Sequence, residues 1–173
     1  MGIRYRVWQT WQFLTAAPLN ATAWSTIEDQ LTPAELLLFQ AYRPSDRRHA
    51  YRVMCALQKA GHHEPALLTA ALLHDVGKTR LPLSIGERVL VVLGWKLLPG
   101  RAAAWSHGEP AGWRRAFVIK ARHAEWGAEM AAQAGSHPQV VDLIRRHQEP
   151  PSSETAGEED QLLHRLQWAD DRS

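Results

Sequence analysis

The chain contains 173 residues, with 20 Lys and Arg against 18 Asp and Glu, and its single cysteine is Cys55. This length is typical of one compact domain that needs no disulfide for stability, and a single cysteine excludes a disulfide framework and any CxxC metal site. The near-neutral charge disfavours a protein that binds nucleic acid along a basic stripe.

The first 20 residues contain Arg4 and Arg6 followed by a half-apolar stretch, which Gln9 and Gln12 interrupt. No clean apolar run follows the basic residues, so we expect this segment to belong to the folded domain and not to a secretory signal. We expect no transmembrane segment, because no apolar run is long enough to span a bilayer. A lone cysteine also favours a reducing compartment, and the predicted location is the cytoplasm.

Helical patterns dominate the chain, and no segment shows the alternation that is typical of a strand. The run Thr32-Pro33-Ala34-Glu35 is a capping box with proline at the first helical position, and it predicts a helix that begins here. The dipeptide Arg43-Pro44 ends this helix. Ser45 or Asp46 is then the expected cap of the next helix.

The next two predicted helices lead to an adjacent histidine and aspartate. The first carries His49 on its apolar face and ends near Gly61, and the second runs from Leu67 to Leu73 with almost wholly apolar residues. Such composition is typical of a central, buried helix. This helix runs directly into His74-Asp75, and Gly77 is the expected C-cap.

Residues 81–113 have a less regular pattern. The segment from Val89 to Leu98 is apolar except for Gly94 and Lys96, and it is too short to cross a bilayer. It predicts a core or lid helix, with a helix lying on a membrane surface as the alternative. Three tryptophans of this region are expected to pack in the core, although they are also candidates for a pocket mouth: Trp95, Trp105 and Trp113.

Three helices are predicted in the rest of the chain. Two of them carry His123 and His147, and the last, after a polar loop from Pro150 to Gly157, carries Asp170. The prediction is therefore an all-α protein with one domain over residues 1–173. Residues 1–44 form a helical extension packed on a core of residues 45–173.

Several histidines and aspartates fall on the apolar stripes of their own predicted helices, where they face the expected core. His147 lies in register with Ile144, and Asp170 lies in register with Leu166. A buried carboxylate is costly unless a positive charge compensates it, and a metal ion is the simplest such charge. Four histidines and two aspartates of this kind indicate a site for one or two divalent ions. They are His49, His74, Asp75, His123, His147 and Asp170.

In chain order these six residues resemble the H…HD…H…H…D signature of the HD-domain superfamily. HDVGK at 74–78 is similar to the central motif of that family, and HAEWGAEMA at 123–131 is similar to the segment with its next histidine. IRRHQE at 144–149 and LQWADD at 166–171 are similar to its last two ligand regions. The resemblance covers residues 45–173 and implies a bundle of about six to eight helices.

The resemblance also implies a role for each residue. His49, His74, Asp75 and Asp170 would hold a first metal ion, and Asp75 would bridge to a second ion that His123 and His147 also hold. Lys78 matches the family lysine that approaches a substrate phosphate, so Asp75 and Lys78 are the predicted catalytic residues. The ions are one or two divalent metals, drawn from Mn, Fe, Co, Ni, Mg and Zn.

The activity implied is that of a metal-dependent phosphohydrolase, a phosphomonoesterase or phosphodiesterase that uses a metal-activated water on a small phosphorylated substrate such as a nucleotide. Cyclic-dinucleotide phosphodiesterases of this superfamily carry a GYP segment after their later histidine, whereas this chain has IRRHQEPPSSE, which disfavours cyclic-di-GMP. Two alternatives remain open. One is an HD-type di-iron oxygenase with the same ligand pattern, and the other is a non-catalytic metal-binding module.

Overall fold

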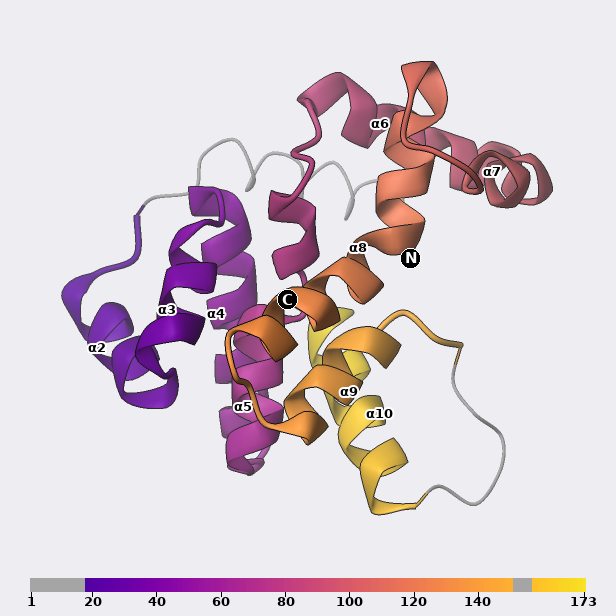
Figure 1. Cartoon of the computed structure of the whole chain (residues 1–173). Coiled ribbons are helices and arrows are strands. Elements are labelled where there is room, and N and C mark those ends of the chain that lie inside the picture. The colour runs from indigo at the N-terminus through magenta and orange to yellow at the C-terminus, as the bar shows by residue number, and fades with distance from the viewer. Residues whose placement is uncertain (1–17, 151–156) are drawn as a thin grey trace.

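The computed structural model describes residues 18–150 and 157–173 (Figure 1). Residues 1–17 of the predicted N-terminal extension and most of the predicted 150–157 loop lie outside these ranges. The described residues form nine α-helices, two short 3-10 helices and no strand, so the all-α prediction is confirmed with one helix more than expected. The helices are α2 (Ala21–Gln30), α3 (Pro33–Gln40), α4 (Pro44–Lys59), α5 (Pro65–Leu73), η1 (Val76–Thr79), α6 (Ile85–Leu97), α7 (Pro99–Trp105), η2 (Gly112–Arg114), α8 (Arg115–Gln133), α9 (Pro138–Arg146) and α10 (Glu158–Asp170).

Proline at the first helical position begins five of these helices, because its fixed φ suits that position and its missing N–H is not needed there. The predicted capping box of α3 is present: Glu35 N–H donates to the Thr32 hydroxyl, and the Glu35 carboxylate accepts from Thr32 N–H at 2.9 Å. The prediction that Ser45 or Asp46 caps α4 is wrong. Pro44 begins that helix one residue earlier, and no side chain caps it.

The main core surrounds α5, whose residues Leu67 to Leu73 are all buried. This helix packs against α4 and α9, with α2, α3 and α10 at its sides. Figure 1 shows α5 between these helices in the lower half of the molecule. An apolar helix enclosed in this way fixes the position of the two residues that follow it, His74 and Asp75.

Gly77 does not cap α5, contrary to the prediction. The helix ends at His74 in right-handed conformation, and Gly77 lies within η1 without a positive φ. A Cβ at Gly77 would come within 1.9 Å of the carbonyl oxygen of His123 in α8. Glycine is needed because η1 and α8 approach backbone to backbone, and Gly127 of α8 supports the same approach from the other side.

The helices α6 and α7 form an arm (residues 85–105) that lies at the top of Figure 1, with α8 running from it down into the bundle. A small second core holds the arm to α8, formed by Val91, Ala102, Ala116 and Phe117. A core helix or a lid helix was expected over residues 89–98; Val91 alone is buried among the residues of α6, so the core helix is wrong. No helix in the described part of the chain is long and apolar enough to cross a membrane.

Candidate metal centre

Three buried histidines use the same hydrogen bond to orient their rings. In His74, His123 and His147 the Nδ1–H donates to the backbone carbonyl three residues earlier. A carbonyl oxygen only accepts, so this bond fixes a proton on Nδ1 and directs Nε2 into the interior. Histidines that bind metal ions are commonly held in this way. The N···O distances are 2.9 Å to Ala71, 2.8 Å to Lys120 and 2.7 Å to Ile144.

The local sequence explains two of these bonds. His74 is the C-cap of α5, and His147 is the C-cap of α9. The last carbonyls of a helix have no N–H partner within it, and each imidazole N–H satisfies one of them. Each helix end therefore orients the ring of a candidate metal ligand, and the same contact satisfies one of the helix's own carbonyl groups.

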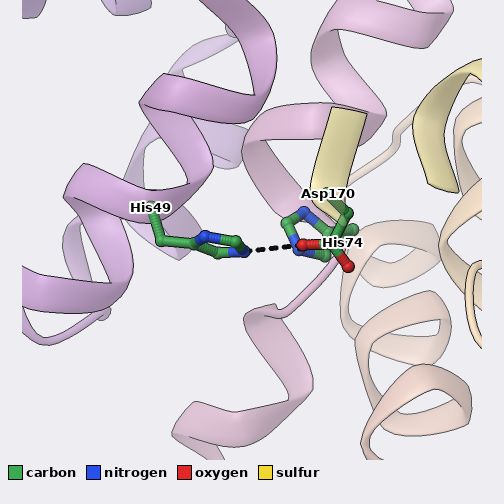
Figure 2. Close-up of side chains that lie close together, drawn as sticks. All are labelled: His49, His74 and Asp170. Atoms are coloured by element: carbon green, nitrogen blue, oxygen red, sulfur yellow. Dashed lines mark ion pairs between the residues drawn. The ribbon is translucent and has the colours of Figure 1, made fainter. Parts of the chain in front are cut away.

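The first group of candidate ligands consists of His49 from α4, His74 from the end of α5 and Asp170 from the end of α10 (Figure 2). Asp170 Oδ1 lies 2.8 Å from His49 Nε2 and 3.6 Å from His74 Nε2. One donor atom from each residue lies within 4.8 Å of the other two. Segments that are far apart in the sequence thus supply three donors to one point.

The second group consists of Asp75, His123 and His147, and all three are buried. Asp75 Oδ1 lies 3.1 Å from His123 Nε2 and 3.7 Å from His147 Nε2. The other oxygen, Oδ2, lies 3.6 Å from His74 Nε2 and is ion-paired with Lys78. The Asp75 carboxylate therefore lies between the two groups, with one oxygen toward each.

Two positive charges balance the carboxylates of Asp75 and Asp170. Burial alone would lower the pKa of His74, but the adjacent Asp75 and Asp170 outweigh it and raise this pKa to about 9. Burial disfavours the ionised form of Asp75, yet Lys78 and His74 hold its pKa well below the usual range. At neutral pH the imidazolium of His74 and the ammonium of Lys78 are the cations closest to Asp75.

The other two histidines are neutral. Burial lowers the pKa of His147 to about 3, and it also lowers the pKa of His123. Because their Nδ1 atoms carry the proton, both Nε2 atoms present a lone pair near the negatively charged Asp75 Oδ1, and the lone pair of His123 also accepts from the Gln148 amide. A cation among these atoms would be attracted by all of them.

These observations test whether the residues fit a metal ion, and they do. His74 Nε2 is buried and has no hydrogen-bond partner among the described residues, although two carboxylates lie 3.6 Å away. A buried polar atom without a hydrogen bond is unusual and is explained by a ligand of the right charge. The mixture of imidazole and carboxylate donors suits a divalent transition metal.

Comparison with protein families gives a match to the HD domain over residues 47–173, which is well over half of the chain. The chain belongs to the HD-domain family. This family comprises metal-dependent phosphohydrolases, in keeping with the two groups of candidate ligands. Comparison with curated proteins and with solved structures gives no match to the chain.

In this HD domain a cavity of about 640 Å³ opens over the candidate ligands. Four of the six residues predicted from the sequence line it, together with Lys78. His74 and His123 lie beneath, fully enclosed. The lining ligands are His49, Asp75, His147 and Asp170.

The cavity wall also contains residues that sequence reasoning missed: Lys120, Gln148, Trp168 and Arg172. Lys120 lies one helical turn before His123, so the helical period could have placed it on the same face. The side-chain amide of Gln148 lies 3.0 Å from His123 Nε2 and donates to it. The Arg172 guanidinium lies 4.9 Å over the Trp168 ring, and no sequence motif predicts that contact.

The predicted tryptophans of residues 81–113 do not line the cavity. Trp105 and Trp113 pack edge to face at 5.0 Å between ring centroids, and Trp105 packs in the same way on Phe117. Trp113 remains 57% exposed. The expectation of packing in the core holds for Trp105, which is partly buried against the second core, and is wrong for Trp113 and for Trp95, which is 36% exposed.

Proposed function

We propose that this HD-domain protein is a phosphoric ester hydrolase that requires one or two divalent metal ions and acts on a small phosphorylated substrate. The observation that carries the proposal is the arrangement of two three-residue donor groups at the floor of one cavity, with Asp75 between them. A carboxylate with candidate donors on both sides favours a pair of ions.

In this proposal one ion is held by His49, His74 and Asp170, and the other by Asp75, His123 and His147, which are the residues that the structure groups together. A bound divalent ion would supply Lewis acidity, lowering the pKa of a water molecule and offsetting charge on phosphoryl oxygens.

The protein's own residues prepare the site for this chemistry. The three Nδ1 hydrogen bonds hold the rings in place before an ion arrives, so little reorganisation is required. Asp75 contacts His74 of one donor group and His123 of the other, so it fixes the distance between the two groups. Lys78 is 34% exposed at the cavity wall, and its ammonium is free to leave Asp75 for a substrate phosphate once an ion compensates that carboxylate.

The cavity indicates the size and charge of the substrate. A volume of about 640 Å³ lies within the range of pockets that bind nucleotide-sized ligands. Lys78, Lys120 and Arg172 lie in its wall, and Trp168 offers an aromatic surface beside them. Cationic and aromatic groups in one cavity favour a phosphate attached to a planar group, as in a nucleotide.

The test compares the manganese-loaded wild type with Asp75→Ala and Lys78→Met on phosphomonoesters, phosphodiesters and nucleotides. Asp75→Ala is expected to lower kcat by at least about a thousandfold, and Lys78→Met by about a hundredfold with metal content retained. Asp29→Ala, an exposed aspartate on α2, is the matched control and should keep full activity.

Three results would contradict the proposal. Hydrolysis that survives Asp75→Ala would place the chemistry elsewhere. Metal binding without turnover of any substrate would indicate a non-catalytic metal-binding module. A mixed-valence iron pair that consumes O₂ without hydrolysing phosphate esters would indicate a di-iron oxygenase.

A further inference from the structure

The outward face of α6 is apolar. Ile85, Val89 and Val92 are spaced by four and three residues, Leu93 lies four residues after Val89, and the four side chains are 41–53% exposed. This spacing places them in a single stripe. Nine of the eleven exposed large apolar side chains in the described residues lie between 85 and 113, so the exposure is concentrated in one region.

The fold of the arm does not require this stripe. The inward side of α6 is already packed, since Val91 is buried and Gly94 lies against the Phe117 ring of α8. Among the described residues, the helices that pack on α6 are α7 and α8, and they do so at the small core around Val91. Contiguous exposed apolar surface of this kind marks a contact with another molecule or with a membrane.

The segment that contains the stripe is rich in positive charge. Lys96 continues it by one helical turn and is exposed, as are Arg101, Arg114 and Arg122 on the neighbouring elements. Residues 85–122 contain seven Lys and Arg but two Glu, whereas the whole chain has a net charge of +2, so the rest of the chain is net negative. Glu87, one of the two acidic residues, is paired with Arg115 at 2.6 Å.

Tryptophans accompany this charge. Lys120 Nζ lies 5.4 Å over the Trp95 ring, and the Arg114 guanidinium lies 5.3 Å over the Trp113 ring. Both tryptophans are at least 36% exposed. An apolar helix face with basic and tryptophan residues at its border is the composition of helices that lie in the plane of a membrane interface.

Charge also discriminates between the possible occupants. A symmetric dimer through this face would bring Lys96 and its basic neighbours of one copy against those of the other, which is unfavourable. The stripe itself contains only aliphatic groups before Lys96 and offers no hydrogen bonds to specify a protein partner. A bilayer with anionic headgroups needs no such bonds and attracts the surrounding cations.

We propose that the α6 face docks on the surface of an anionic membrane, with its aliphatic stripe at the acyl boundary and Lys96 and the neighbouring arginines at the headgroups. The helix would lie on the membrane and not cross it. Lys120 both lines the cavity and contacts Trp95 of α6, so the docking face reaches the edge of the candidate active site.

The experiment measures sedimentation of the full chain with two kinds of vesicle, phosphatidylcholine alone and phosphatidylcholine in which roughly a third of the lipid is phosphatidylserine. The wild type should bind the anionic vesicles at low salt and release from them at high salt. Val89→Glu/Leu93→Glu should lower the partition coefficient at least about tenfold, because it places charge in the stripe. Lys96→Gln should lower it about fivefold.

Matched controls lie on the bundle. Leu37→Glu changes an isolated, 68% exposed leucine of α3, and Lys59→Gln removes an exposed lysine at the end of α4. Both should bind vesicles like the wild type. All these substitutions are at exposed positions, so we expect the variants to fold like the wild type, and circular dichroism checks this.

Each remaining outcome would overturn the proposal. If the wild type binds neither kind of vesicle, membrane docking is excluded. If the α6 variants bind vesicles like the wild type, another surface of the protein binds the membrane. Loss of binding in Trp8→Ser/Trp11→Ser with the α6 variants unaffected would assign it to residues 1–17. A dimer that Val89→Glu/Leu93→Glu converts to a monomer, without vesicle binding, would show that a second copy covers the face.

Discussion

The bundle around α5 and the α6–α7 arm distribute polar and apolar side chains in opposite ways. The bundle buries His74, Asp75, His123 and His147 among apolar helices, while the arm exposes a row of aliphatic side chains on α6. Each departs from the general rule that apolar groups are inside and charged groups outside. Such departures cost stability, and they mark the places where a protein meets something other than water.

The two regions also differ in how tightly they are built. In the bundle, η1 and α8 touch backbone to backbone at Gly77, whereas α6 rests on the Phe117 side chain at Gly94. A backbone contact has no room to adjust, and an aromatic ring can shift. The donor groups therefore rest on a rigid backbone contact, whereas the arm is attached through a side-chain contact that can adjust.

The largest effect on stability is expected for Gly77→Ala. The new Cβ would lie 1.9 Å from the His123 carbonyl oxygen, so η1 and α8 would have to separate. We expect a loss of about 3 kcal/mol in the free energy of unfolding, measured by urea denaturation of the metal-free protein. Gly86→Ala, where the new Cβ meets nothing within 4 Å, is the control. If Gly77→Ala lost less stability than Gly94→Ala, the corresponding variant of the arm, the contrast between the two regions would be contradicted.

The next effect concerns pH, and it is specific to the bundle. His74 has a pKa of about 9 in the metal-free protein, so it carries a proton at neutral pH that a metal ion must displace. Binding therefore releases this proton, and the apparent affinity for Mn²⁺ should rise about tenfold per pH unit between about pH 7 and 9 and then level off. Competition with a chelator at several pH values measures it. An affinity independent of pH across this range would contradict the charge assignment.

A smaller effect is expected for Gly94→Ala in the arm. The Cβ would lie 2.5 Å from an atom of the Phe117 ring, which can move at moderate cost. We expect a loss of about 1 kcal/mol in the free energy of unfolding, with the metal affinity of the bundle unchanged. Urea denaturation and the same chelator competition give both quantities. A change in metal affinity would show that the arm and the donor groups are coupled.

Local signals made much of the bundle predictable. The capping box at Thr32, the proline that begins α3, and the apolar run that ends at Leu73 all act within a few residues, where sequence patterns are informative. The order of six histidines and aspartates gave the candidate ligands through the family resemblance, and the structure brings all six together in two adjoining groups.

Long-range contacts explain what the sequence could not predict. Position 77 requires glycine because the backbone of α8 leaves no room for a Cβ there. Asp46, which was expected to cap α4, instead forms an ion pair with Arg88 of α6 at 3.2 Å. The sequence left open whether α6 is exposed, because an apolar run has the same pattern whether another element covers it or not. Which donors face each other also depends on the folded bundle, as with Asp75 and His123.

The most direct test of the account is the number of divalent ions bound per chain, measured by elemental analysis of manganese-loaded protein for wild type, His49→Ala, His123→Ala and His63→Ala. Two ions are expected in the wild type and in the control His63→Ala, whose histidine is exposed on the loop before α5. His49→Ala and His123→Ala should each retain one ion, since each removes a donor from a different group. A wild type that binds no ion, or variants that all bind as the wild type does, would contradict the assignment of the two groups as metal sites.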